Sequence, residues 1–133
     1  MTTHPRNLFF KLGIFGTIQF LILVHLAMWF YAGGTLHEAG AEGYSFTHNF
    51  FSDLGRTHTF SGARNVPTSQ IFRFTMSVVG ICFVAFFFAL PGLFRSPLSK
   101  GLGIAAAVFG VLAGLCYFGI AQVPYNVDYW GHR

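Results

Sequence analysis

Charged side chains are scarce in this sequence, and acidic ones are the scarcest. Asp, Glu, Lys and Arg make up 9% of the 133 residues, with 4 acidic against 8 basic side chains, whereas about 25% is usual for a soluble domain. Hydrophobic residues account for 53% of the chain, and 18 of them are Phe. This balance excludes an ordinary soluble domain and predicts an all-α integral membrane protein with a single domain, residues 1–133.

Basic blocks and cysteine pairs are lacking too. The net charge of +4 is small, and no Lys/Arg block or nucleic-acid motif carries it, so a nucleic-acid partner is not expected. Cys82 and Cys116 both fall inside apolar runs, which favours small buried hydrophobes over a disulfide or a metal-binding pair.

Three apolar runs are long enough to cross a membrane as helices, at about 12–31, 71–93 and 102–123. Roughly 20 residues at 1.5 Å per residue span a hydrocarbon core of about 30 Å. Arg6 and Lys11 resemble the basic flank of a signal peptide, but the apolar run is longer than usual and lacks an A-x-A cleavage site. We therefore expect three retained transmembrane helices.

The polar segment at about 32–70 is too long for a simple connection between helices. Loops beyond about 12–15 residues are usually functional or disordered, and the aromatic residues of this one, Tyr44 and Phe46 among them, argue against disorder. We expect it to fold back onto the membrane surface, with a short interfacial helix at about 47–54. The 94–101 connection is so short that the second and third helices must run antiparallel and touch.

Charge sets the expected orientation. Three crossings place the N-terminus and the 94–101 connection on one side, which holds four basic residues and no acid: Arg6, Lys11, Arg95 and Lys100. The other side holds four basic residues together with all the acids, and long loops cross membranes with less regard for charge. We therefore expect a bacterial inner (plasma) membrane protein with a cytoplasmic N-terminus, and with the long loop and the tail, 124–133, outside.

The loop and the tail then share one membrane face, so their polar residues can converge. The candidate ligand-binding residues are Asn49, Ser52, Asp53, Gly55, Arg56, Arg64, Asp128 and His132. Asp53 has a structural interpretation, because Ser and Asp close turns and Gly55 can supply a positive φ at the end of one. It also has a functional one, as a carboxylate fixed by the Arg56 guanidinium that holds a lipid headgroup or acts as an acid or base.

Metal and nucleophile motifs are missing from the loop. His48, Asp53 and His58 follow one another at intervals of five, which fits neither H-E-x-x-H nor a zinc C-x-x-C pattern. Ser52 lacks the G-x-S-x-G elbow of a nucleophile. No metal site is predicted, although a site that includes Asp128 or His132 of the tail is left open as an alternative. The sequence also leans against an enzyme.

His25 lies inside the first spanning run, where ionisable residues are rare and often functional. It can be a neutral side chain bonded to a neighbouring helix, or a ligand of a haem or chlorin metal. No second intramembrane histidine exists in the chain, so a bis-histidine haem needs a second copy or a partner.

The third run carries small residues at intervals of four, Ala106, Gly110 and Gly114. Such a stripe lets another helix approach closely, and Ala85 and Ala89 of the second run are expected to face it. We interpret the stripe as a packing seam.

At the long loop the chain resembles the domain of unknown function 998 family of prokaryotic multi-pass membrane proteins, which is distantly similar to DRAM and Sfk-like proteins. The matching residues are Asn49, Ser52, Asp53, Leu54, Gly55, Asn65, Phe72, Gly119, Pro124, Asp128 and His132. Members of that family typically have about six spanning helices, so the resemblance implies an N-terminal half that dimerises or docks onto a partner membrane protein. It carries no established activity, and its distant relatives favour contact with membrane lipid.

Three functional hypotheses follow. The first is a lipid-headgroup-binding or membrane-assembly module that acts through Asp53, Arg56, Arg64 and His132. The second is a membrane-embedded lipid hydrolase or transferase. The third is an accessory subunit of a respiratory or photosynthetic complex with His25 as a haem or pigment ligand, and the cofactor content is left open.

Overall fold

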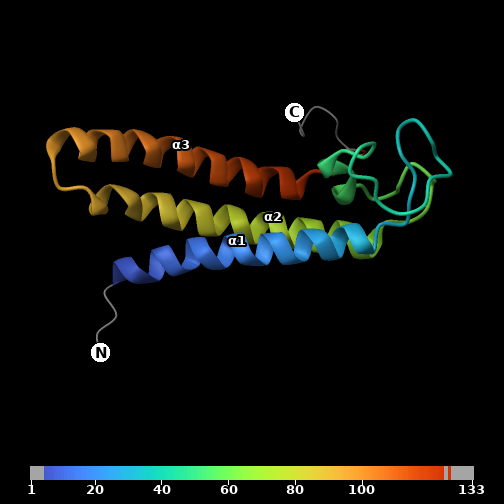
Figure 1. Ribbon diagram of the computed structural model, residues 1–133, viewed down its shortest axis with the longest axis horizontal. Helices are drawn as coiled ribbons and strands as arrows, with labels where there is room; N and C mark the ends of the chain where they lie inside the picture. Colours follow the sequence, from blue (N-terminus) through green and yellow to red (C-terminus); the bar gives the residue numbers. More distant parts are fainter. Residues whose placement is uncertain (1–4, 125, 127–133) are drawn as a thin grey trace.

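The computed structural model describes residues 5–124 and 126, which form three long helices and two short 3-10 helices (Figure 1). In chain order these are α1 (Pro5–Trp29), η1 (Phe51–Gly55), α2 (Val66–Ala89), η2 (Leu90–Leu93) and α3 (Pro97–Gln122). Three segments are long and apolar enough to cross a membrane, namely Asn7–Trp29, Val66–Leu93 and Pro97–Gln122. The expected all-α class with three candidate spans is confirmed, and η1 lies where a short interfacial helix was expected.

All three long helices begin earlier than hydropathy suggested, and α1 begins at Pro5. α2 begins at Val66, with Asn65 in the N-cap position but no side-chain cap hydrogen bond, and with Pro67 in its first turn, where proline is tolerated because the first backbone N–H groups have no helical partner. α3 begins at Pro97, after Ser96, whose hydroxyl oxygen accepts a hydrogen bond of 3.2 Å from the Ser99 N–H. A side-chain cap therefore marks the start of α3, and proline in the first turn is common to both helices.

The long helices lie side by side in a single layer with α2 in the middle (Figure 1). α1 and α3 pack against different sides of α2. Only 22% of the residues in each apolar window are buried inside the protein. Both broad faces of the layer therefore offer apolar side chains to the bilayer.

Glycines bring α1 and α3 close to α2. A methyl group added to Gly16 in α1 would lie 2.6 Å from the Cys82 Cβ, and one added to Gly80 in α2 would lie 2.6 Å from the Gly114 carbonyl oxygen. Gly110 packs against the ring of Phe87. Since real Cβ atoms do not approach so closely, these positions need glycine for the helices to pack as they do.

The predicted seam of the third run exists, but its partners differ from those expected. Gly110 and Gly114 are buried, whereas Ala106 is exposed and Ala107 is buried in its place. The partners on α2 are Gly80, Val84 and Phe87, so the expectation that Ala85 and Ala89 face the stripe was wrong. The ring of Phe87 fills the space that the glycines leave.

At the loop end of the layer all three long helices share a hydrophobic cluster with η1. Its buried members are Val24, Ala27, Tyr31, Leu54, Phe72, Met76 and Ala121. The shared cluster anchors the loop on the helix ends.

The cysteines are both free thiols, Cys82 buried and Cys116 exposed, so the expectation that both are buried holds only for Cys82.

Candidate functional site

The long loop is a folded cap on one end of the helix layer (Figure 1). It turns back directly after α1 at Gly33 and Gly34, whose φ values of 102° and 88° favour glycine. The Gly34 N–H donates to the Ala41 carbonyl at 2.7 Å, and the Thr35 N–H donates to the Glu38 carbonyl at 2.8 Å. The predicted fold-back of the loop is therefore built from backbone hydrogen bonds.

Asn49 joins three parts of the loop. Its side-chain Nδ2 donates to the Gly34 carbonyl at 2.9 Å and to Oδ2 of Asp53 at 3.2 Å. Its Oδ1 accepts from the Ser45 N–H at 3.0 Å. The amide is buried, and it uses both donors and one acceptor, so Asn49 acts as an internal tie.

Asp53 is also internal, with 1% of its surface exposed. Its Oδ2 reaches back to accept the Phe50 N–H at 2.8 Å, in addition to the bond from Asn49. Its Oδ1 is buried and has no hydrogen-bond partner among the described residues. These contacts support the structural interpretation, in which the carboxylate closes the turn that begins η1.

The negative charge of Asp53 contributes to a raised pKa at two tyrosines. Burial, and then Asp53, raise the pKa of Tyr31 to about 12, and the same two causes raise the pKa of Tyr44. The Tyr31 hydroxyl donates to the Gly34 carbonyl at 3.3 Å, and the two rings meet edge-on with centroids 5.7 Å apart. Both phenols therefore stay protonated at neutral pH.

Gly55 ends η1, and glycine is needed there for a different reason from the one expected. Its φ is not among the positive values, which belong to Gly33, Gly34, Gly43 and Gly62, so the prediction of a positive φ was wrong. A methyl group at Gly55 would lie 2.8 Å from the ring of Phe72. Glycine is needed here so that η1 can rest on α2.

Asn65 ties η1 to the start of α2. Its Nδ2 donates to the carbonyl oxygens of Leu54 at 3.3 Å and Arg56 at 3.0 Å, and its N–H donates to the Thr57 carbonyl at 3.0 Å. Only the resemblance singled out this residue.

The remaining loop candidates lie nearer the surface. The Arg56 Nε donates to the His58 carbonyl at 3.2 Å, and its guanidinium lies 4.1 Å from the centroid of the Phe60 ring. Arg64 is exposed, and its backbone pairs with that of His58 in an isolated antiparallel β-bridge. Ser52 is half-buried. These residues surround the turn that Asn49 and Asp53 hold.

The tail meets the loop, as the topology predicted. Asn126 and Thr57 form a reciprocal pair, in which the Thr57 N–H donates to Oδ1 of Asn126 at 3.0 Å and Nδ2 of Asn126 donates to the Thr57 hydroxyl at 2.8 Å. Asp128 and His132 lie outside the described residues. Their place in the site stays a prediction.

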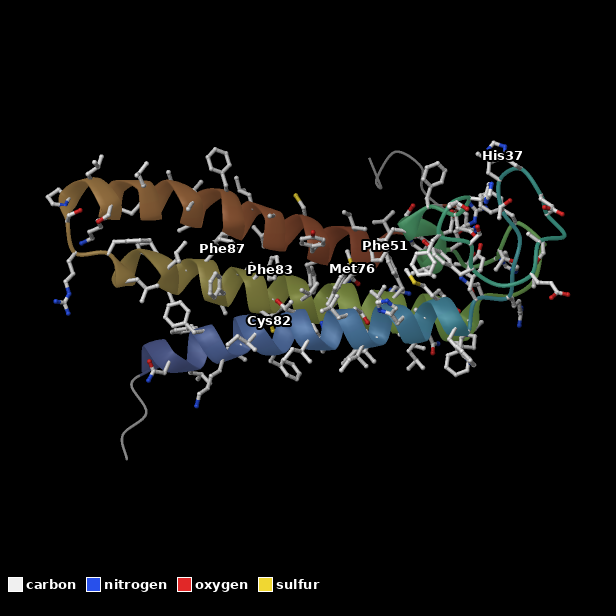
Figure 2. The ribbon with its side chains drawn as sticks, viewed as in Figure 1. His37, Phe51, Met76, Cys82, Phe83 and Phe87 are labelled. Atoms are coloured by element: carbon white, nitrogen blue, oxygen red, sulfur yellow. The ribbon has the colours of Figure 1, made fainter. Side chains whose placement is uncertain are left out.

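A polar cleft of about 470 Å³ opens in the first half of the loop. It is lined by Thr35, His37, Glu38, Ala41, Ser45 and His48, and Figure 2 shows His37 on the outer part of the loop. Nδ1 of His48 lies 3.1 Å from the Ser45 hydroxyl and 2.8 Å from the Thr47 hydroxyl. Within residues 5–124 and 126, no three His, Cys, Asp or Glu residues are grouped to hold a metal.

His25 points away from α2. It lies nine residues after the buried Gly16, which is roughly half a turn around the helix from it, and it is exposed. Its Nδ1 lies 2.7 Å from the Leu21 carbonyl oxygen. Because a carbonyl only accepts, Nδ1 carries the hydrogen, and the lone pair of the neutral ring belongs to Nε2.

Arg73 of α2 connects that helix to the end of α3. Its Nε donates to the Ala121 carbonyl at 3.1 Å, which satisfies one of the carbonyl groups left open at the end of α3. The last turn of α3 contains no basic residue. The cation that complements the negative end of this helix therefore comes from α2.

Comparison of the chain with protein families, with curated proteins and with solved structures gives no match. The resemblance to the domain of unknown function 998 family stays a prediction. Function is inferred below from the position and chemistry of the side chains.

Proposed function

We propose that this chain is a small multi-pass membrane protein whose loop binds a phospholipid headgroup at the membrane surface. The observation that supports the proposal is the cleft on the loop, whose lining side chains are mainly polar. Trp29, Phe46 and Phe50, at the end of α1 and on the loop, are 84%, 74% and 62% exposed, and exposed aromatic rings favour the level of the headgroups. We therefore expect the cleft to lie at the headgroup level.

The cleft offers groups of both signs. His37 and His48 carry ring N–H groups, and Ser45 carries a hydroxyl, all of which can donate to phosphate oxygens. Glu38 supplies a carboxylate that can accept from an ammonium group. This combination suits a zwitterionic headgroup with a free ammonium, such as phosphoethanolamine.

The residues predicted from the sequence have a supporting part in this proposal. Asn49 and Asp53 hold the turn behind the cleft through buried hydrogen bonds. Arg56, Arg64 and Asn126 lie beyond that turn, where they can contact neighbouring headgroups. Binding therefore depends on Asp53 through the shape of the loop.

Lipid retention tests the proposal. The protein is released from bilayers containing phosphatidylethanolamine and phosphatidylcholine in equal parts, and the lipids that it keeps are counted by native mass spectrometry. We expect Glu38→Gln to lower the preference for phosphatidylethanolamine about fivefold to tenfold, because a charged hydrogen bond is lost. His58→Ala, a loop substitution outside the cleft, should leave the preference unchanged. Equal retention of both lipids by the original protein would overturn the proposal.

A second candidate function is axial ligation of a haem or chlorin metal by His25. The observation that favours it is the assigned tautomer, since metal-ligating histidines commonly donate their other ring N–H to a carbonyl. Nε2 is left with its lone pair on the exposed side of α1. The Leu21 carbonyl would also hold the ring in one orientation.

Titration with haemin tests this second candidate. Stoichiometric binding with a shifted Soret band, lost in His25→Ala and kept in His37→Ala, is the expected result. A low-spin spectrum together with a dimeric mass would indicate one His25 from each of two copies. Identical titrations of the original protein and His25→Ala would eliminate the site.

A further inference from the structure

The second lipid-facing feature lies at the other end of the layer, where α1 begins and α2 turns into α3 (Figure 1). An apolar groove of about 400 Å³ runs there between α1 and α2. Gly13 and Thr17 of α1 line it together with Phe83, Phe86 and Phe87 of α2, and Figure 2 shows Phe83 and Phe87 along α2. We call it the α1–α2 groove.

The groove is apolar although it contains a threonine. The Thr17 hydroxyl donates to the Gly13 carbonyl at 3.0 Å, so its hydrogen is used within α1. Gly13 has no side chain to fill the space, and Phe86 lies over it, since a methyl group there would be 2.8 Å from the ring. The surface that remains suits a hydrocarbon chain.

Lys11 stands at the headgroup side of this groove. Ile14 and Ile18, which also line it, follow Lys11 by three and seven residues, so all three share one face of α1. Lys11 is exposed and lies one turn closer to the membrane surface. A lysine in this position reaches the phosphate level while its stem covers apolar surface.

The same arrangement recurs between α2 and α3. A groove of about 370 Å³ is lined by Ile104 and Ala107 of α3, together with Pro91 of η2. Lys100 precedes Ile104 and Ala107 by four and seven residues and is exposed. Two grooves therefore each carry a lysine one turn toward the same end of the layer.

The charge at this end has one sign. Lys11, Arg95 and Lys100 are exposed there, and every acidic residue of the described chain, Glu38, Glu42 and Asp53, lies in the loop at the opposite end. An acyl chain gains little hydrophobic free energy on moving from bilayer to groove, because both are apolar. The headgroup charge therefore decides which lipid is held.

We propose that the α1–α2 groove is a binding site for an anionic phospholipid, with one acyl chain against Gly13 and Thr17 and the phosphate at Lys11. A parallel second copy is a poorer occupant, because it would bring Lys11 and Arg95 of both copies together with no acid nearby. The site is separate from the loop cleft, and the proposal requires only that the three long helices cross the membrane.

Competition between two lipids tests this site. The full chain is reconstituted in bilayers of equal parts phosphatidylglycerol and phosphatidylcholine, and the retained lipids are counted by native mass spectrometry. We expect phosphatidylglycerol to be enriched, and Lys11→Gln to reduce that enrichment about fivefold. Arg73→Gln makes the same change of charge at the opposite end of the molecule, where Arg73 bonds the Ala121 carbonyl, and should leave the enrichment unchanged.

A second variant tests the groove itself. Thr17→Phe places a ring where the acyl chain is proposed to lie, so it should lower retention of both lipids at this site while Lys11 stays in place. Equal retention of the two lipids by the original protein, equal effects of Lys11→Gln and Arg73→Gln, or a lipid-free dimer would each overturn the proposal. Because Glu38→Gln acts only on the loop cleft, the two lipid sites can fail independently.

Discussion

Asn49 and Asp53 form one hydrogen-bonded unit, so their effects on stability are expected to be coupled. Asn49→Ala removes three side-chain hydrogen bonds, two of them buried, and Asp53→Ala removes two, one of them buried. Each substitution should lower the free energy of unfolding by about 2–4 kcal/mol. The double variant should cost less than the sum, because the bond between the two side chains is counted twice. Thermal unfolding in detergent measures all three.

Ser52→Ala is the control for this cycle, because Ser52 is adjacent in sequence and half-buried. Its melting temperature should stay close to that of the original protein. If Asp53→Ala unfolded at the original temperature and lost only lipid binding, Asp53 would be a ligand-contacting residue and not a structural one.

Tyr31 makes the folded protein sensitive to alkaline pH. Its pKa is raised from 10.0 to about 12 by burial and by Asp53, so between these values the unfolded state releases the phenolic proton and the folded state keeps it. Stability is therefore unaffected below about pH 10 and falls as pH rises toward about 12, by roughly 3 kcal/mol at most. Melting curves across this interval should show the loss.

Tyr31→Phe removes the titrating group but keeps the ring. The variant loses the hydrogen bond to Gly34, so its stability at neutral pH is lower, yet its decline between about pH 10 and 12 should be shallower. An unchanged slope would mean that other groups cause the alkaline loss.

At the scale of single residues, the sequence predicted a turn at Asp53 but did not predict that the Asp53 side chain is buried. Ser-Asp-Leu-Gly is a local pattern, and local patterns predict turns. The tie from Asn49 to Gly34 spans 15 residues, and the need for Gly55 comes from Phe72 on another element. Such tertiary contacts leave no local signal, which is why the φ of Gly55 was misjudged and Asn65 received no role.

The end of α3 depends on a side chain from α2. Arg73→Ala removes the hydrogen bond to the Ala121 carbonyl and a cation at the negative end of the helix, which should cost about 1–2 kcal/mol. Hydrogen exchange should become faster in the last turn of α3. Arg95→Ala, at the opposite end of the layer, is the control and should leave that turn unchanged.

The α2–α3 contact depends on glycine at particular positions of α3. Substitutions at a contacting glycine and at a non-contacting glycine of α3 test this dependence. Gly114→Ala adds a methyl group 2.8 Å from the Gly80 carbonyl oxygen, whereas a methyl group on Gly119 meets open space. Gly114→Ala should therefore destabilise the protein by about 1–3 kcal/mol. Gly119→Ala should be neutral or stabilise it by up to about 1 kcal/mol, because alanine is the better helix former. Equal melting temperatures would contradict the seam.

At the scale of elements, hydropathy and loop length were sufficient to predict the three spans and the packing of α2 on α3. The start of α3 differs because Ser96 caps the helix ahead of its apolar run, and the start of α2 differs because Pro67 is compatible with a first helical turn. The α1–α2 pairing was not foreseen, since it depends on the match of Gly16 with Cys82. Gln19 adds a buried hydrogen bond of 3.2 Å to the Thr75 carbonyl, which hydropathy does not report either.

At the scale of the whole molecule, charge and structure divide the layer into two unlike ends. One end carries Lys11, Arg95 and Lys100, and the other carries the folded loop with every described acid. Basic residues next to spanning helices favour the cytoplasmic side. We therefore predict that the loop faces away from the cytoplasm.

Cysteine labelling in intact cells tests this orientation. Ser61 is exposed on the loop and Ser96 is exposed in the turn before α3, so each can be replaced by cysteine in a background that carries Cys82→Ala and Cys116→Ala. A membrane-impermeant maleimide should label Ser61→Cys in intact cells and Ser96→Cys only after lysis. The two positions act as controls for each other, since a leaky membrane would label both. The reverse pattern would place the basic end outside, and the Lys11 site would then face the opposite leaflet from the one that charge predicts.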